Sequence, residues 1–173
     1  MQNSISGSEY CLTFMIEPPT AVRPGVSFIL PVIVAVRRIS GVGTDPFQQL
    51  GATISLRDET GTTTIAGLNG SVTSSVRSQL GNTSNGYARF GPLSIANPGR
   101  YVLRVILAVN TFSGVTTRAV IDSAAIHVHA EAATSQRPSV YIPHSAAQVV
   151  RLQGLVSENI DISEAQIAAW QQA

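Results

Sequence analysis

The chain of 173 residues contains no lysine, a single cysteine and few charges of either sign. All 11 basic residues are arginine, they face 10 acidic residues, and charged residues make up 12% of the chain. The net charge of +1 argues against strong long-range attraction to nucleic acid. The single cysteine, Cys11, excludes a disulfide within the chain and is typical of a reducing compartment.

Long apolar runs and targeting segments are also missing. The longest apolar run, residues 26–36, is too short to span a bilayer and is broken by Ser27 and Pro31. Residues 1–9 are polar and lack the charged and apolar parts of a signal peptide, so we expect no membrane association. Hydrophobic residues make up 44% of the chain, which excludes charge-rich disorder and allows one domain with a substantial core.

Alternating apolar residues predict β-strands along most of the chain. Residues 26–38 are apolar at both alternating sets of positions, which predicts a central strand buried on both faces, with a bend at Pro31. A turn is expected at residues 58–61, and a bulge at Ser123 and Ala124. The other expected strands cover residues 12–16, 52–57, 62–65, 71–80, 87–90, 93–95 and 100–109, and residues 115–129 are expected to form a strand pair or one long bent strand. In residues 100–109, Tyr101, Leu103, Val105 and Leu107 fall on one face. Strands at regular spacing with Gly and Pro turns predict an all-β, immunoglobulin-like β-sandwich.

Short C-terminal helices complete the predicted fold. Residues 145–155 and 163–172 carry apolar residues at helical spacing, which a strand would not show. In the second helix Ile167 and Trp170 are three residues apart and share one face. Few charges surround that face, so we expect it to be buried against a second chain.

The sequence therefore predicts three segments. Residues 1–8 form a flexible tail, residues 9–162 form the β-sandwich domain, and residues 163–173 form an association helix.

Three short motifs follow one another in the middle of the chain: GSVTSS at residues 70–75, FGPLSI at residues 90–95 and GRYVLRV at residues 99–105. In their order and spacing they resemble the fungal velvet domain, whose members carry the run GxxxSS, F.F.DLS and G.YRL.F.L. Other pieces extend the resemblance over residues 10–162. The resemblance implies an immunoglobulin-like fold related to the Rel-type DNA-binding domain, in a regulator of fungal development and secondary metabolism.

The resemblance also implies partners, location and site residues. It implies a nuclear and cytoplasmic protein without a cofactor, which acts as a homodimer or as a heterodimer with another velvet-type protein. The family's DNA contacts come largely from a basic segment between the first strand and the proline-rich strand. The matching segment here, residues 20–27, holds one basic residue, Arg23. Weak or partner-assisted DNA binding is therefore expected.

Other arginines sit at the ends of expected strands. Arg37 and Arg38 end one strand, and Arg57 ends another. If these ends share one edge with Arg23, the four side chains would form a cluster able to grip phosphates or a partner's carboxylates. Ordinary solvated strand ends are an equally good interpretation. Arg104 lies in the middle of an apolar strand, where a charge either pairs with an acid or faces a partner.

A His-x-His pair, His127 and His129, falls on one face of an expected strand, and Glu131 follows on the same face. Such a set can bind zinc or iron. We favour the simpler interpretation, in which Ile126 and Val128 point inward and the histidines line the wet face. The sequence shows no nucleophile elbow and no phosphate-binding loop, so we expect no enzyme and no metal.

Two functions remain open after the sequence is read. The first is a velvet-like regulatory protein that pairs with another chain. The second is a structural or self-assembling β-sandwich subunit without nucleic-acid binding, which low charge and many Ser and Thr residues fit equally well. A metal enzyme using His127 and His129 is a weaker third.

Overall fold

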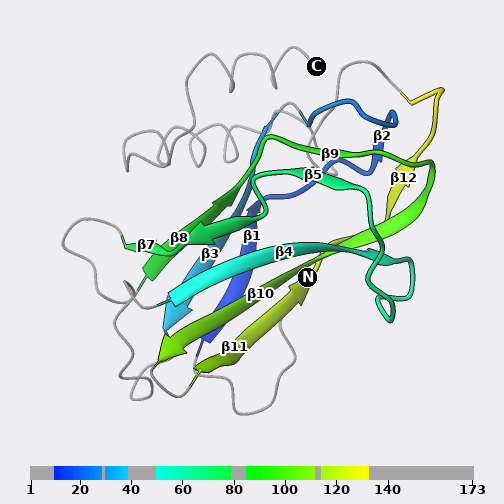
Figure 1. The fold of residues 1–173 in the computed structure, drawn as a ribbon. Helices are drawn as coiled ribbons and strands as arrows, with labels where there is room; N and C mark the ends of the chain where they lie inside the picture. Colours follow the sequence, from blue (N-terminus) through cyan, green and yellow to red (C-terminus); the bar gives the residue numbers. More distant parts are fainter. Residues whose placement is uncertain (1–9, 29, 39–49, 79–84, 112–113, 133–173) are drawn as a thin grey trace.

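The computed structural model of the chain describes residues 10–28, 30–38, 50–78, 85–111 and 114–132, and every regular element in these ranges is a β-strand. Two sheets lie face to face, with their strands running roughly along one direction (Figure 1). The all-β expectation is confirmed. The expected tail 1–8 and helices 145–155 and 163–172 lie outside the described residues. Within the described ranges, no helix has the length and hydropathy to cross a membrane.

The first sheet has four antiparallel strands. Its order is β1 (Tyr10–Ile16), β3 (Val32–Arg38), β8 (Asn85–Phe90) and β7 (Arg77–Ser78). Alternate residues of β1 are buried, as the sequence pattern predicts, and the others face away from the core.

The second sheet is built around β10 (Gly99–Thr111), its longest described strand. On one side of β10 lie β4 (Leu50–Asp58) and then β6 (Thr73–Ser75). On the other side β11 (Gly114–Asp122) and β12 (Ile126–Val128) pair with successive parts of β10, and β2 (Ala21–Val22) pairs in parallel with β12. We call it the β10 sheet. A small third sheet pairs β5 (Leu68–Gly70) with β9 (Leu93–Ile95).

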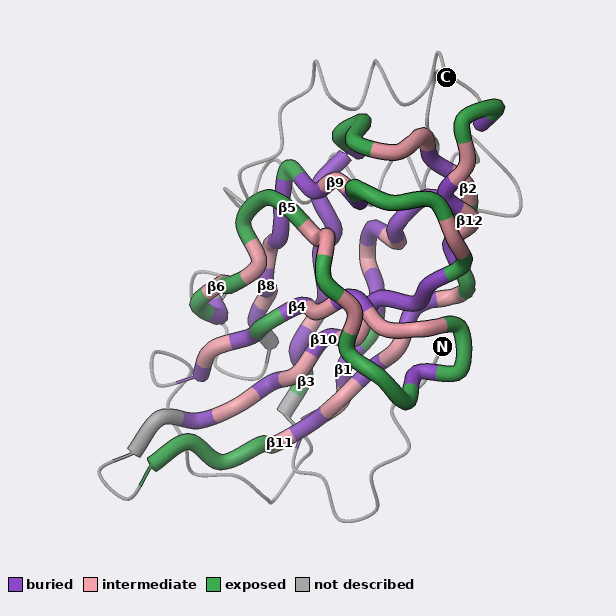
Figure 2. The backbone as a smooth tube through the Cα atoms, turned by 45° about the vertical axis from the view of Figure 1, so that its right-hand side comes forward, coloured by how far each residue is buried: buried purple, intermediate pink, exposed green. Residues whose placement is uncertain are grey.

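The core lies between the two main sheets. It is formed by the alternate residues that each strand turns inward, and these positions appear as the buried stretches in Figure 2. The members with 2% exposure or less include Leu12, Val34, Val36, Ile54, Leu56, Phe90, Leu103, Val105 and Leu107. The predicted inward face of β10 is therefore confirmed. Burying a side chain of this size stabilises the fold by roughly 1.5–3 kcal/mol.

The strand predicted over residues 26–38 is only partly correct. β3 begins at Val32, directly after Pro31, because proline has no N–H to give to a strand ladder. Before it, Phe28 lies outside any strand, and its amide donates to the carbonyl of Leu93 in β9 at 2.8 Å. Burial on both faces is confirmed at Ile33, which is fully buried yet lies outside the main core cluster.

The single strand predicted over residues 71–80 is wrong. The chain forms two short strands there, β6 paired with β4 and β7 paired with β8, with buried Val76 between them. Because β4 and β8 belong to different sheets, this segment crosses from one sheet to the other and closes one side of the sandwich. The strand predicted over residues 62–65 is reduced to one bridge between Arg57 and Thr64.

Of the two expectations for residues 115–129, the strand pair is confirmed: β11 and β12 are separated by a break at residues 123–125. At the break, Ser123 donates its backbone N–H to the carbonyl of Leu103, and its hydroxyl accepts the Leu103 N–H at 2.9 Å. The side chain of Ser123 thus replaces a carbonyl of the strand ladder. This is how β10 keeps its hydrogen bonds satisfied across the predicted bulge.

One glycine of the GSVTSS motif is fixed by packing. Gly70 ends β5 with a φ of +118°, and a Cβ there would overlap the carbonyl oxygen of Pro92. Only glycine adopts this conformation without strain and leaves room for the β5–β9 contact.

Candidate functional site

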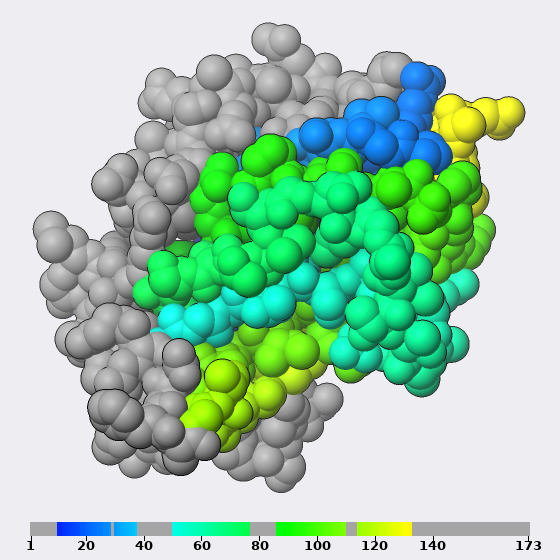
Figure 3. Space-filling model, viewed as in Figure 1, coloured from blue at the N-terminus to red at the C-terminus, as the bar shows by residue number. Residues whose placement is uncertain are grey.

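The face of the β10 sheet that points away from the core carries both charged and small uncharged side chains. In Figure 3, β4, β10 and β11 form the cyan and yellow-green part of the surface turned to the viewer, below the segment that leads to β6. We call it the outer face. It includes Gly51, Thr53, Ser55, Arg57, Val102, Arg104, Ile106, Ala108, Thr117, Val120 and Asp122. The half near β12 is charged, and the half near the β10–β11 hairpin consists of small and uncharged residues.

An ion pair lies at the centre of the charged half. Arg104 faces Asp122 across the β10–β11 ladder, with Nε to Oδ1 at 2.7 Å and Nη2 to Oδ2 at 2.9 Å. The hydrogen bonds that Arg104 donates to the Asp122 carboxylate raise the pKa of the guanidinium above its ordinary value. Of the two expectations for Arg104, the acid within the same chain is therefore found. The two side chains keep 25% and 35% exposure, so the pair remains accessible from the surface.

The turn after β4 packs on this ion pair. Gly61 is buried with a φ of +77°, and a Cβ there would lie 3.3 Å from both Arg104 Nη2 and Asp122 Oδ2. Arg57 donates from Nη1 to the Gly61 carbonyl at 3.4 Å. The structure thus brings Arg57 and Arg104 to one glycine, a neighbourhood that the sequence did not reveal.

Asp58 holds the same turn closed. Its Oδ1 accepts the Thr60 hydroxyl at 2.8 Å and the Thr62 backbone N–H at 2.9 Å. The Thr60 hydroxyl, with further help from Thr62 and Thr63, holds the pKa of Asp58 well below its ordinary value although partial burial opposes it. The turn predicted at residues 58–61 is confirmed and is tied by side chains as well as by backbone.

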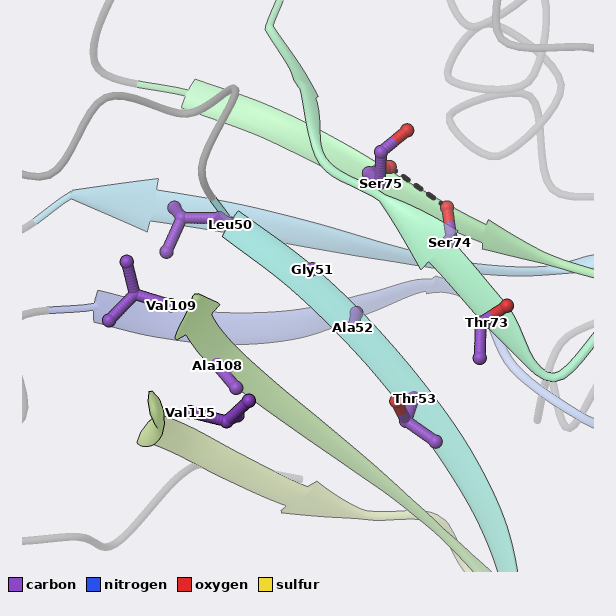
Figure 4. A pocket seen from close by; sticks show the side chains of 10 residues that line it. All are labelled: Leu50, Gly51, Ala52, Thr53, Thr73, Ser74, Ser75, Ala108, Val109 and Val115. Carbon is purple, nitrogen blue, oxygen red and sulfur yellow. Dashed lines mark hydrogen bonds between the residues drawn. The ribbon is translucent and has the colours of Figure 1, made fainter. Parts of the chain in front are cut away.

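The small-residue half contains a groove of about 610 Å³. Its floor is low because Gly51 of β4 is paired with Ala108 of β10, and neither residue carries a long side chain. Figure 4 shows the lining side chains, with the Ser74 hydroxyl donating to the Ser75 carbonyl at 2.9 Å. The lining residues are Leu50, Gly51, Ala52, Thr53, Thr73, Ser74, Ser75, Ala108, Val109 and Val115.

The four arginines predicted to form a cluster do not share one edge. Arg37 and Arg38 end β3 opposite Asn85 and Tyr10. The β6–β7 crossing places this end of β3 near the start of β4, and Arg57 lies about 20 Å further along β4. Figure 1 likewise places the end of β3 at the opposite end of the sandwich from β12.

Arg23 is held near β12 instead. It follows β2, and its Nε donates to the carbonyl of Ala132 at 2.8 Å. Among the four arginines, Arg37 has an exposed side chain, and Arg23 and Arg57 are half-buried. Ile167 and Trp170, the predicted association residues, lie outside the described residues.

His127 of β12 and His129, which follows the end of β12, lie next to each other beside the charged half of the outer face. The ring centroids of His127 and His129 are 4.3 Å apart, and His127 is the ladder partner of Arg100. Partial burial, with Arg100 and His129 nearby, lowers the pKa of His127 from its ordinary value. Ile126 and Val128 are buried and the histidines half-buried, so the predicted orientation of this strand is confirmed. In the described ranges no three His, Cys, Asp or Glu residues gather closely enough to hold a metal ion.

Sequence reasoning missed the groove. Its floor depends on Gly51 and Ala108, which are 57 positions apart and become neighbours only through the β4–β10 register. The one available signal was the uncharged run of residues 114–117 beside it. Comparison of the sequence with protein-family models and with curated proteins finds no match.

Proposed function

We propose that this chain is a velvet-like regulatory protein with an immunoglobulin-like fold, which acts by associating with a second chain and catalyses no reaction. The strand order supports the fold. In immunoglobulin-type sandwiches one sheet holds the first, second, fifth and fourth strands, and the other holds the third, sixth and seventh. Here β1, β3, β8 and β7 form one sheet, and β4, β10 and β11 form the core of the other. The C-terminal helices are part of the same proposal.

A tyrosine at the start of β10 gives further support. The Tyr101 hydroxyl lies 3.1 Å from the carbonyl oxygen of Asn97 and 3.0 Å from that of Pro98, so it can donate to either. A tyrosine that bonds back to the chain just upstream of the sixth strand is a feature of immunoglobulin-like sandwiches. It fixes the corner at which the chain enters β10.

The motif residues that resemble the velvet domain have structural roles in this chain. Gly70 permits the β5–β9 contact, Tyr101 fixes the β10 corner, and the Ser74 hydroxyl accepts the Arg89 backbone N–H at 3.0 Å. The resemblance therefore supports the scaffold more strongly than any contact with DNA.

The outer face is the observation that carries the proposed association. Its small-residue half presents Gly51, Thr53 and Ala108 around an open groove, and Val115 beside it is 72% exposed. Uncharged surfaces with accessible apolar atoms favour burial against a partner, because no charge has to be desolvated. The proposed partner is a second copy or another velvet-type chain, in the nuclear and cytoplasmic setting that the resemblance implies. Ile167 and Trp170 are proposed to add to the association surface.

DNA contact is proposed as weak or partner-assisted. The described residues contain nine arginines and five acidic residues, while the remaining residues contain two arginines and five acidic residues. The β-sandwich is thus more basic than the whole chain. However, Arg23, Arg57 and Arg104 are held by partners within the chain. Among the predicted residues whose side chains are described, the exposed Arg37, at the opposite end of the sandwich, is the best placed to reach phosphates.

One substitution tests the association surface. Ala108→Arg should fill the groove and lower the molecular mass measured by size-exclusion chromatography with light scattering. Thr13→Arg is the matched control, because Thr13 is exposed on the other sheet and faces away from the groove. If both variants keep the mass of the wild type, the groove is not the association surface. Gel-shift titrations over salt, with and without a velvet-type partner, test the DNA part, since phosphate contacts give a steep salt dependence.

The second candidate is a self-assembling structural subunit without nucleic-acid binding. The observation that favours it is the exposed, uncharged start of β11, which offers a sheet edge to further copies. A large assembly in light scattering, together with no gel shift in either state, would support this candidate over the regulator.

A further inference from the structure

The first part of β11 is the edge of the β10 sheet. In the described part of the chain, β11 pairs with β10 on one side, and no strand is paired on its other side. Residues 114–117 are all exposed, and they form the green stretch at the start of β11 in Figure 2. An edge strand presents alternate backbone N–H and C=O groups that can pair with another chain.

The ladder register shows which backbone groups point to this edge. The backbone N–H of Ser123 donates to the Leu103 carbonyl, so Leu103 and Ser123 form a hydrogen-bonded pair of the ladder. Antiparallel pairs alternate between hydrogen-bonded and non-bonded positions, so Thr116, opposite Val109, is bonded to β10. Val115 and Thr117, on either side of Thr116, therefore direct their N–H and C=O groups away from β10.

Nothing in the local sequence protects this edge. Natural edge strands are commonly protected by a charged side chain, a proline or a bulge. Residues 114–117 read GVTT, with no charge and no proline, and the bulge comes later, after Thr117. The two threonines and the valine are β-branched residues that favour extended pairing.

We propose that β11 pairs antiparallel with β11 of a second copy of this chain, around a two-fold axis at Thr116. In this register Val115 of each copy lies opposite Thr117 of the other. Both residues direct their backbone groups to the edge, so the two pairs exchange four backbone hydrogen bonds. The proposal rests on the proposed function and specifies the association surface.

The partner is a second copy because the edge is complementary to itself. The two outward residues are two positions apart, so a two-fold axis between them satisfies both at once. Their side chains lie on the outer face next to Ala108, so the paired strands would extend the groove floor into the second copy. The strand contact alone is small, and we expect a dimer with a dissociation constant that is roughly micromolar or weaker.

Charge substitutions at the edge test the pairing and its register. Val115→Lys should raise the dimer dissociation constant of the full chain at least tenfold in sedimentation equilibrium, because the lysine opposes edge pairing. Ala66→Lys is the matched control: it adds the same charge to an exposed position between β4 and β5, outside the β10 sheet and its groove, and should change the constant less. The double variant V115K/T117E should recover dimerisation, because the register places each new lysine opposite a new glutamate.

The outcomes separate this inference from the proposed function. An unchanged dimer in Val115→Lys overturns the β11 pairing and leaves association through another surface intact. Failure of V115K/T117E to recover overturns the register. A wild-type chain that is monomeric at all concentrations also overturns the inference, and the regulator then depends on a different velvet-type partner. Open assemblies larger than a dimer overturn the two-fold arrangement and support the structural subunit.

Discussion

At the scale of single residues, buried hydroxyl groups complete the backbone hydrogen bonding where strands are interrupted. Ser123 is 3% exposed, and its hydroxyl bonds the Leu103 amide at the break between β11 and β12. Tyr101 has a comparable role at the start of β10, through the carbonyls of the preceding turn. Both residues support β10, the strand at the centre of the outer face.

Ser123→Ala should destabilise the protein by about 1–3 kcal/mol, because it leaves the buried Leu103 N–H without its acceptor. Chemical denaturation with urea measures this change in the free energy of unfolding. Ser71→Ala is the control, since Ser71 is exposed in the described structure and should change stability by less than about 0.5 kcal/mol. Equal stability of the two variants would show that the Ser123 hydroxyl is not needed at the break.

At the scale of elements, the turn after β4 connects stability to pH. Asp58 accepts hydrogen bonds from Thr60 and Thr62 in its ionised form, and its pKa in the folded chain lies below the ordinary value of 3.8. A carboxyl whose pKa is lowered by folding stabilises the fold above its unfolded pKa. That stabilisation is lost as the pH falls from the unfolded pKa towards the folded one.

Asp58→Asn should therefore flatten the acid side of the stability profile. The wild type should lose unfolding free energy more steeply than the variant between about pH 5 and pH 2, because asparagine does not titrate. Near pH 7 the variant should be the less stable protein, since the charge-assisted bonds to the turn are gone. Thermal unfolding measured from about pH 2 to about pH 7 covers both effects. Glu59→Gln, at the neighbouring exposed position, should keep the wild-type acid slope.

At the scale of the whole molecule, the two halves of the outer face offer different chemistry to a partner. The ion pair of Arg104 and Asp122 is already satisfied within the chain, so it would give orientation to a complex more than affinity. The groove and the β11 edge are uncharged, and they are the surfaces that association would bury. We therefore expect the uncharged half to contribute most of the binding affinity and the half with the ion pair to contribute specificity.

The C-terminal segment should add to association. Deleting residues 163–173 removes Ile167 and Trp170 and should lower the oligomeric state, as measured by light scattering. The far-UV circular dichroism signature of the β-strands should remain, because the core described above contains none of these residues. If the truncated chain keeps its mass in solution, the segment is an intrachain contact and not an association element.

The sequence by itself determined the elements that local pattern controls. Alternation in β1, β4 and β10 predicted both the strands and their inward faces, and the turn at residues 58–61 was visible from its residue types. These features depend on neighbours within a few positions, where side-chain periodicity and turn chemistry act. The all-β class follows from them.

Only the tertiary structure decided which strands meet. The split of residues 71–80 between two sheets, the start of β3 after Pro31, and the separation of Arg37 from Arg57 all depend on partners far away in the chain. The groove floor and the Arg57, Gly61 and Arg104 neighbourhood arise in the same way. Strand pairing is set by long-range packing and ladder register, and a local pattern does not encode either, because the same alternation allows several partners.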